Sequence, residues 1–108
     1  MTSSFEACIQ ACNECASACE ACASACLQES DVAMMAECIQ LDRDCADACR
    51  MAAALMARHS RYAKAFCELC AQICDACAAE CGKHAADHCQ YCAALCKACA
   101  EECRRMAA

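Results

Sequence analysis

The chain has 108 residues, 19 of them cysteine, and a formal net charge of −6 at pH 7. The negative charge disfavours a nucleic-acid partner, because phosphate binding needs a basic surface. Proline is absent and Gly82 is the sole glycine, which excludes collagen-like and linker-like compositions and disfavours β-rich folds, whose turns use these residues. No run of about 18 apolar residues occurs, so we expect no membrane span.

The apolar residues are mostly small. Alanine (29 residues) and cysteine (19 residues) dominate, whereas Leu, Ile, Val and Phe together number 11. That share lies below the ~20% at which disorder becomes a concern. A core of alanines and thiols therefore needs added stability, which small scaffolds commonly obtain from disulfides or metals. The length predicts one domain over residues 1–108.

Four helices are predicted in chain order, over residues 4–28, 31–57, 61–81 and 85–106. The connections between them are very short, so consecutive helices are expected to be antiparallel neighbours. The predicted fold is all-α, an up-down-up-down four-helix bundle. We expect Gly82 to end the third helix in the left-handed conformation that favours glycine.

Polar side chains are placed to begin the first three helices. Ser3 and Glu6 fit a capping box, in which each side chain satisfies a backbone donor of the other residue. Either Ser30 or Asp31 is the expected N-cap of the second helix, and Ser60 is expected to cap the third.

The cysteines repeat with alternating spacings of three and four residues. A C-x2-C-x3-C-x2-C-x3-C pattern occurs on the first, third and fourth predicted helices, and Cys8 extends it on the first. This spacing is the a/d seam of a coiled coil, so the thiols are predicted to line the bundle axis. On the second helix, Met35 and Asp42 occupy two positions of the same frame. The candidate metal ligands are Cys8, Cys12, Cys15, Cys19, Cys22, Cys26, Cys38, Cys45, Cys49, Cys67, Cys70, Cys74, Cys77, Cys81, Cys89, Cys92, Cys96, Cys99 and Cys103.

Four functions other than copper binding could explain so many cysteines: a disulfide framework, a thiol oxidoreductase, an iron–sulfur protein and a zinc or cadmium buffer. A disulfide framework is disfavoured, because the count is odd and cysteines three or four apart on one helix make strained bridges. A thiol oxidoreductase needs one activated cysteine at a helix N-terminus, and an iron–sulfur cluster usually takes its ligands from tight cysteine runs. These redox alternatives stay open, as does a zinc or cadmium buffer resembling metallothionein.

Charge and ligand softness favour Cu(I). Nineteen thiolates packed on one axis would need an equal positive charge, because buried charge must be paired. Cu(I) is soft and monovalent, so about one ion per cysteine would restore the formal charge of the metal-free chain. Zinc needs four ligands, and these cysteines would satisfy only about five unbridged zinc ions.

The C-x3-C pairs on four antiparallel helices resemble the bacterial copper storage proteins. The stretch at residues 41–47 (LDRDCAD) and the turn at residues 81–84 (CGKH) are similar to members of that family. The resemblance implies storage of many Cu(I) ions without catalysis, loading at one end of the bundle, and a homotetramer. Residues 1–6 (MTSSFE) carry no basic or apolar leader segment, and this resembles the cytosolic branch of the family, so we expect a cytoplasmic protein.

Four other side chains are candidate copper ligands. His84, His88 and Met35 are predicted to gather at one end of the bundle, where imidazole and thioether groups could capture incoming ions. The simpler alternative is that the two histidines are exposed surface residues beside a turn and bind no metal. Asp42 could touch an ion or accept hydrogen bonds, or it could face solvent if the second helix were rotated to bury Leu41.

The opposite end is predicted to be closed. Phe5, Leu55 and Phe66 are most simply an apolar plug. His59 lies in a predicted loop, where we expect it to be solvated.

Overall fold

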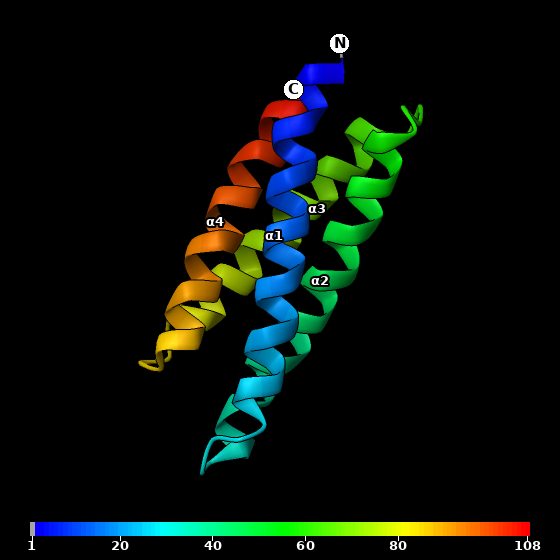
Figure 1. Ribbon diagram of the computed structural model, residues 1–108. Helices are drawn as coiled ribbons and strands as arrows, with labels where there is room; N and C mark the ends of the chain where they lie inside the picture. The colour runs from blue at the N-terminus through cyan, green and yellow to red at the C-terminus, as the bar shows by residue number, and fades with distance from the viewer. Residues whose placement is uncertain (1) are drawn as a thin grey trace.

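Four antiparallel helices form an elongated bundle in the computed structural model, which describes residues 2–108 and their side chains from residue 5 onward (Figure 1). The helices are α1 (Thr2–Cys26), α2 (Ala36–Ala57), α3 (Ala63–Cys81) and α4 (Asp87–Ala107), with a short 3-10 helix, η1 (Val32–Met35), before α2. The molecule measures 47 × 17 × 17 Å. The predicted up-down-up-down bundle is confirmed.

The helices pack in a ring, in which α1 contacts α2 and α4, and α3 contacts the same two helices. Figure 1 shows both chain termini and the α2–α3 connection at one end, which we call the terminal end. The α1–α2 and α3–α4 connections lie together at the other end, which we call the histidine end because it holds His84 and His88. The topology therefore brings residues far apart in the sequence to the same end.

Side chains hydrogen-bond to the backbone just before two of the helices, but α2, α3 and α4 have no side-chain cap at their own N-cap residues. The predicted caps of the second and third helices therefore lie ahead of α2 and α3. The Asp31 side chain accepts a hydrogen bond of 3.3 Å from the Met34 amide and so caps η1. Ser60 Oγ accepts one of 3.1 Å from the Tyr62 amide, one residue before α3 begins. The expected capping box at the first helix involves the Ser3 side chain, which lies outside the described side chains.

The prediction of a left-handed glycine at the end of α3 is wrong. Gly82 has φ −63° and ψ −17°, and its amide continues the helical pattern with a 2.9 Å hydrogen bond to the Ala78 carbonyl. The left-handed residue is His59, with φ 54°. There the Ser60 amide donates to the Leu55 carbonyl at 2.9 Å and the His59 amide to Met56 at 3.1 Å. This is the Schellman pattern, which requires a left-handed residue at its centre.

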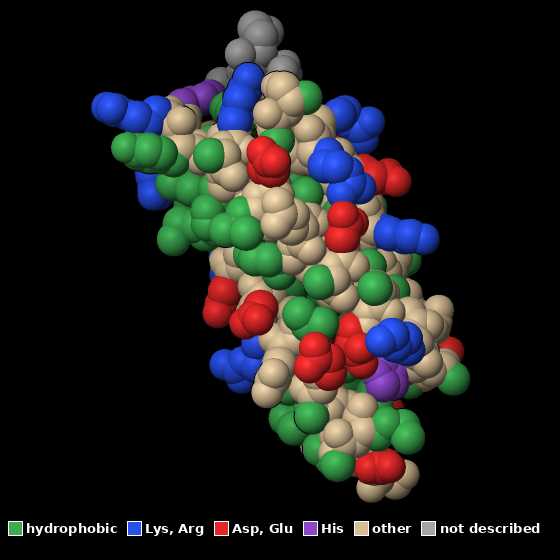
Figure 2. Space-filling view, turned by 180° about the vertical axis from the view of Figure 1, so that it is seen from behind, with side chains coloured by type: hydrophobic (Ala, Val, Ile, Leu, Met, Phe, Trp, Pro, Cys, Tyr) green, Lys and Arg blue, Asp and Glu red, His purple; other side chains and the backbone are tan. Residues whose placement is uncertain are grey.

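Sulfur and alanine fill the core. Each of the nineteen cysteines has 1% or less of its surface exposed, and alanines such as Ala46, Ala52 and Ala100 are fully buried beside them. Small side chains at these positions allow neighbouring helices to approach closely. The charged residues lie outside, and Lys and Arg gather toward the terminal end in Figure 2. Within residues 2–108, no helix combines the length and the apolar character that crossing a membrane would require.

Candidate metal centre

The cysteine side chains form a continuous column of sulfur along the bundle axis. Neighbouring Sγ atoms lie between 3.4 Å apart (Cys38 and Cys81) and 4.0 Å apart (Cys45 and Cys49). All nineteen are free thiols. The a/d spacing predicted this arrangement, because each helix turns the same face toward the axis along its whole length.

Different helices contribute to each layer of the column. Cys12, Cys49, Cys70 and Cys99 come one from each helix, and their Sγ atoms all lie within 4.8 Å of one another. Other groups of four meet the same limit and share members with their neighbours, as Cys49 and Cys99 are shared with the group that adds Cys15 and Cys74. An ion held in one layer is therefore within reach of thiols in the next.

Asp42 adds a buried carboxyl group to the sulfur column. It is fully buried, and its Oδ1 accepts hydrogen bonds from the thiols of Cys77 (3.2 Å), Cys81 (3.3 Å) and Cys92 (3.4 Å). Burial, followed by the nearby Cys92, raises the pKa of Asp42 to about 9. The carboxyl group is therefore protonated at neutral pH when no cation is present. The alternative in which Leu41 is buried and Asp42 faces solvent is wrong, since the seam frame runs unbroken through α2.

His88 lies against the sulfur column at the histidine end. Its Nδ1 is 3.6 Å from Cys22 Sγ and 3.5 Å from Cys89 Sγ. Its Nε2 is 2.8 Å from a carboxylate oxygen of Glu29, in the α1–α2 connection. The imidazole thus stands between the thiols and a partly exposed carboxylate.

The other candidates at this end differ from His88. His84 Nε2 is 3.0 Å from Glu80 Oε2, and no thiol within residues 2–108 lies at hydrogen-bonding distance from it. Met35 is buried, with 5% of its surface exposed, whereas Met34 is 65% exposed. The structure therefore places His88 and Met35 at the edge of the column and His84 beside it.

Burial favours the neutral form of two thiols at the histidine end, whereas hydrogen bonds between thiols lower the pKa of others, such as Cys15 and Cys70. Burial raises the pKa of Cys89 to about 11, and burial also raises the pKa of Cys26 above its ordinary value. These thiols are neutral at pH 7. A monovalent ion that replaces a thiol proton leaves the charge of the core unchanged, which favours uptake of one such ion for each thiol.

Apolar side chains cover the column at the terminal end. Phe5, Leu55 and Phe66 are partly buried and pack against the core, and Met56 is fully buried. The exposed His59 ring lies 5.6 Å from the Phe5 ring, measured between centroids. The predicted apolar plug is confirmed.

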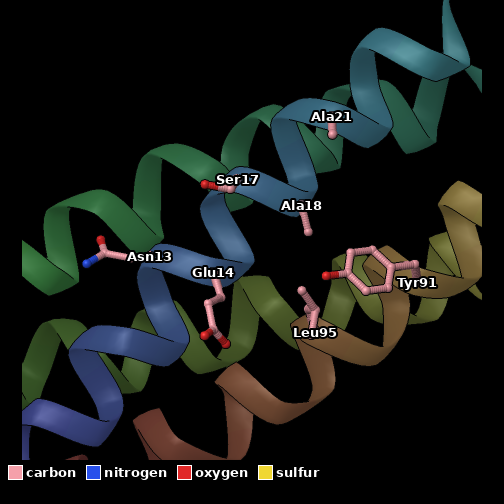
Figure 3. Close-up of a pocket in the computed structure, with 7 residues that line it drawn as sticks. All are labelled: Asn13, Glu14, Ser17, Ala18, Ala21, Tyr91 and Leu95. Carbon is pink, nitrogen blue, oxygen red and sulfur yellow. The ribbon is translucent and has the colours of Figure 1, made fainter.

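A groove on the outside of the bundle differs from the core in the residues that line it. Figure 3 shows one between α1 and α4, in which Tyr91 and Leu95 face Ala18 across the groove. Its lining contains neither cysteine nor histidine. The groups that can hold a soft cation are therefore concentrated inside the bundle.

Sequence reasoning did not identify Glu29 or Glu80 as functional candidates. Glu29 lies in a connection, 59 residues from His88, and no spacing pattern links the two. Glu80 precedes His84 by four residues on a helical turn, so the i, i+4 rule could have paired them.

Comparison with known proteins gives matches along the whole chain. The sequence profile of the copper storage protein (Csp) family matches residues 1–108. The Cu(I)-bound copper storage protein BsCsp3 from Bacillus subtilis is similar in structure, with a TM-score of 0.93 and 52% identity over 97% of this chain and 99% of that chain. A cytosolic copper storage protein from Streptomyces lividans, solved with five coppers, has a TM-score of 0.94 and 40% identity over 98% of this chain and 93% of that chain. The uncharacterized cysteine-rich protein YhjQ of Bacillus subtilis (strain 168) is 53% identical over 78 residues, which is 72% of each chain.

Proposed function

The chain belongs to the copper storage protein family, and from this premise we propose that it stores many Cu(I) ions along the sulfur column and releases them without catalytic turnover. The observation that carries the proposal is the arrangement of nineteen buried free thiols, whose overlapping groups of four meet within 4.8 Å. Soft thiolates select Cu(I), and a monovalent ion replaces each thiol proton without adding charge. The zinc or cadmium buffer and the redox alternatives are not favoured, because the similar solved structures hold copper.

We assign the ligand roles by position. The nineteen cysteines are the proposed ligands along the axis, at a ratio of about one ion per cysteine. Asp42 supplies an oxygen within the column, and His88 supplies a nitrogen at its edge. Met35 is a proposed further ligand at the histidine end. For His84, a role in binding stays a prediction from the sequence.

The proposal also covers the domain organisation, the cellular location and the oligomeric state of the protein. The chain is taken to act as one metal-binding domain over residues 1–108 and to work in the cytosol, like the protein from Streptomyces lividans that is described as cytosolic. The tetramer implied by the family resemblance is also proposed. Sedimentation of the apo and copper-loaded forms would measure the oligomeric state directly.

An anaerobic Cu(I) titration of the reduced protein tests the function. The protein competes with a chromophoric Cu(I) chelator of known affinity, and bound copper is counted per chain. We expect about 15–20 tightly held ions. A variant with Cys15, Cys45 and Cys96 replaced by serine should lose about three of them. Binding of fewer than about five copper ions, with zinc held more tightly in the same assay, would contradict the proposal.

A further inference from the structure

Glu29 and His88 form a carboxylate–imidazole pair at the histidine end of the bundle. Glu29 lies in the α1–α2 connection, and His88 is the second residue of α4. The pair joins these elements through a contact of 2.8 Å, and its side chains are 38% and 27% exposed. The imidazole also contacts the sulfur column through its other nitrogen, so the pair connects solvent with the first thiols.

The contact with Glu29 determines which nitrogen of His88 can bind a metal. A neutral imidazole carries one N–H and one lone pair, and an ionised carboxylate can only accept a hydrogen bond. Nε2 therefore donates its hydrogen to Glu29. The lone pair of Nδ1 then points toward Cys22 and Cys89, whose sulfurs lie 3.6 and 3.5 Å away.

We propose that Glu29 is a positioning residue for copper uptake, holding His88 in the tautomer and orientation whose Nδ1 receives incoming Cu(I) beside Cys22 and Cys89. This inference rests on the proposed storage function. Carboxylates that orient an imidazole ligand fix its tautomer and raise its basicity, and their loss typically costs about 10–100-fold in metal affinity or activity. Glu29 itself touches no sulfur in the described contacts, so it acts through His88.

The neighbouring pair provides a matched comparison. His84 also contacts a glutamate, with Nε2 3.0 Å from Glu80 Oε2, and both of these side chains are 13% exposed. Within residues 2–108, however, the other nitrogen of His84 has no thiol at hydrogen-bonding distance. A glutamate–histidine pair at this end therefore does not by itself bring an imidazole nitrogen to the thiols. The sulfur contact distinguishes His88, and we expect removal of Glu80 to leave uptake unchanged.

The kinetic test uses the reduced full-length protein and Cu(I) supplied by a chromophoric chelator. Stopped-flow absorbance measures the rate of copper transfer for the wild type, Glu29→Ala, Glu29→Gln and the control Glu80→Ala. We expect Glu29→Ala to slow uptake by about tenfold. Glu29→Gln should recover much of the rate, because its amide oxygen still accepts a hydrogen bond from Nε2. Circular dichroism checks that each variant keeps its helices.

A double-mutant cycle makes the proposal specific. In a His88→Ala background, replacing Glu29 should have no further effect on the uptake rate, because the effect of Glu29 passes through the imidazole. A second readout is the ¹⁵N spectrum of the histidine side chains in the apo protein. It should show His88 as the Nε2–H tautomer in the wild type and a mixture of tautomers in Glu29→Ala.

Three results would overturn the positioning role. They are wild-type uptake in Glu29→Ala, equal slowing by Glu29→Ala with and without His88, and equal slowing by Glu80→Ala. The last two would assign the effect to the charge of the surface. Final copper capacity is measured in the same samples and should be unchanged in every glutamate variant. A low capacity in the wild type itself would contradict the storage function, which separates the failure of one proposal from that of the other.

Discussion

The two ends of the bundle carry the same cysteine repeat but are covered differently. At the terminal end, Phe5, Leu55 and Phe66 pack over the last thiols. At the histidine end, His88 contacts the last thiols and Glu29 connects that imidazole to solvent. The repeat lines the whole axis with thiols, whereas the residues that cover the two ends differ. We infer that copper is loaded and released at the histidine end.

The two halves of the column also differ in their ligands. Toward the histidine end, Asp42 places an oxygen among the thiols of Cys77, Cys81 and Cys92. Toward the terminal end, the described contacts along the axis join sulfur to sulfur. The half nearer the histidine end therefore brings oxygen and nitrogen atoms together with sulfur, whereas the described contacts in the other half join sulfur atoms.

The largest expected effect concerns Asp42. Its pKa of about 9 in the folded chain lies above the ordinary value of 3.8, so folding favours the protonated form. That stabilisation is fully present below pH 3.8 and is lost as pH rises toward 9. Between pH 5 and 7.5, the free energy of unfolding of the reduced apo protein should fall by up to about 1.4 kcal/mol per pH unit. Asp42→Asn cannot ionise and should remove this slope.

Urea unfolding at several pH values measures that slope. The groups facing Asp42 are the thiols of Cys38, Cys77, Cys81 and Cys92. Hydrogen bonds among the thiols lower the pKa of Cys38, Cys77 and Cys92 and raise that of Cys81, so the slope of Asp42 is the difference between the wild type and Asp42→Asn. Asp47→Asn is the control, because the Asp47 side chain is 85% exposed. Parallel stability profiles for the wild type and Asp42→Asn would contradict the raised pKa.

Matched pairs of cysteines compare the two ends directly. Replacing Cys22 and Cys89 with serine removes the two thiols that contact His88, and replacing Cys8 and Cys67 removes two thiols at the terminal end. Each variant should lose about two copper ions. Only the first should load slowly, by about tenfold in stopped-flow absorbance, because it removes the partners of the capturing imidazole. Equal loading rates would show that ions do not cross at one preferred end.

The apolar cover at the terminal end should affect stability rather than loading. Phe5→Ala removes a partly buried ring that packs against the core and against His59. We expect a loss of about 1–2 kcal/mol in the free energy of unfolding, less than for a fully buried ring. Chemical denaturation measures this loss, and stopped-flow loading should match the wild type. Slower loading in Phe5→Ala would indicate that this end takes part in uptake.

The smallest expected effect concerns Gly82, which ends α3 without the left-handed conformation that His59 has after α2. Gly82 has φ −63°, so Gly82→Ala needs no left-handed residue. The nearest atom to the added Cβ is the Ala78 carbonyl oxygen at 3.1 Å, which belongs to the preceding helical turn. We expect the free energy of unfolding to change by less than about 1 kcal/mol, since alanine also has the higher helix propensity. A larger loss would show that the Ala78 carbonyl oxygen cannot move away from the added Cβ.

Periodicity predicted the fold and the thiol column, because spacing of three and four residues on four helices leaves one arrangement that buries every cysteine. The same frame correctly placed Met35 and Asp42 inside. It could not predict which histidine reaches the thiols, because His84 and His88 differ by one helical turn beside a connection whose path tertiary packing decides. The Glu29–His88 contact could not be predicted for the same reason. A glycine at a helix end predicts the left-handed conformation, but the Gly82 amide instead continues the helical hydrogen bonding to Ala78.

Diffraction from crystals of the copper-loaded protein, measured on both sides of the copper absorption edge, tests the central claim most directly. We expect a row of anomalous peaks along the bundle axis, about one per cysteine, running from the layer of Cys8 and Cys67 to that of Cys26 and Cys89. At low loading, the first peaks should appear between Asp42 and His88. Copper confined to the surface, or an axis occupied by disulfides without copper, would contradict it.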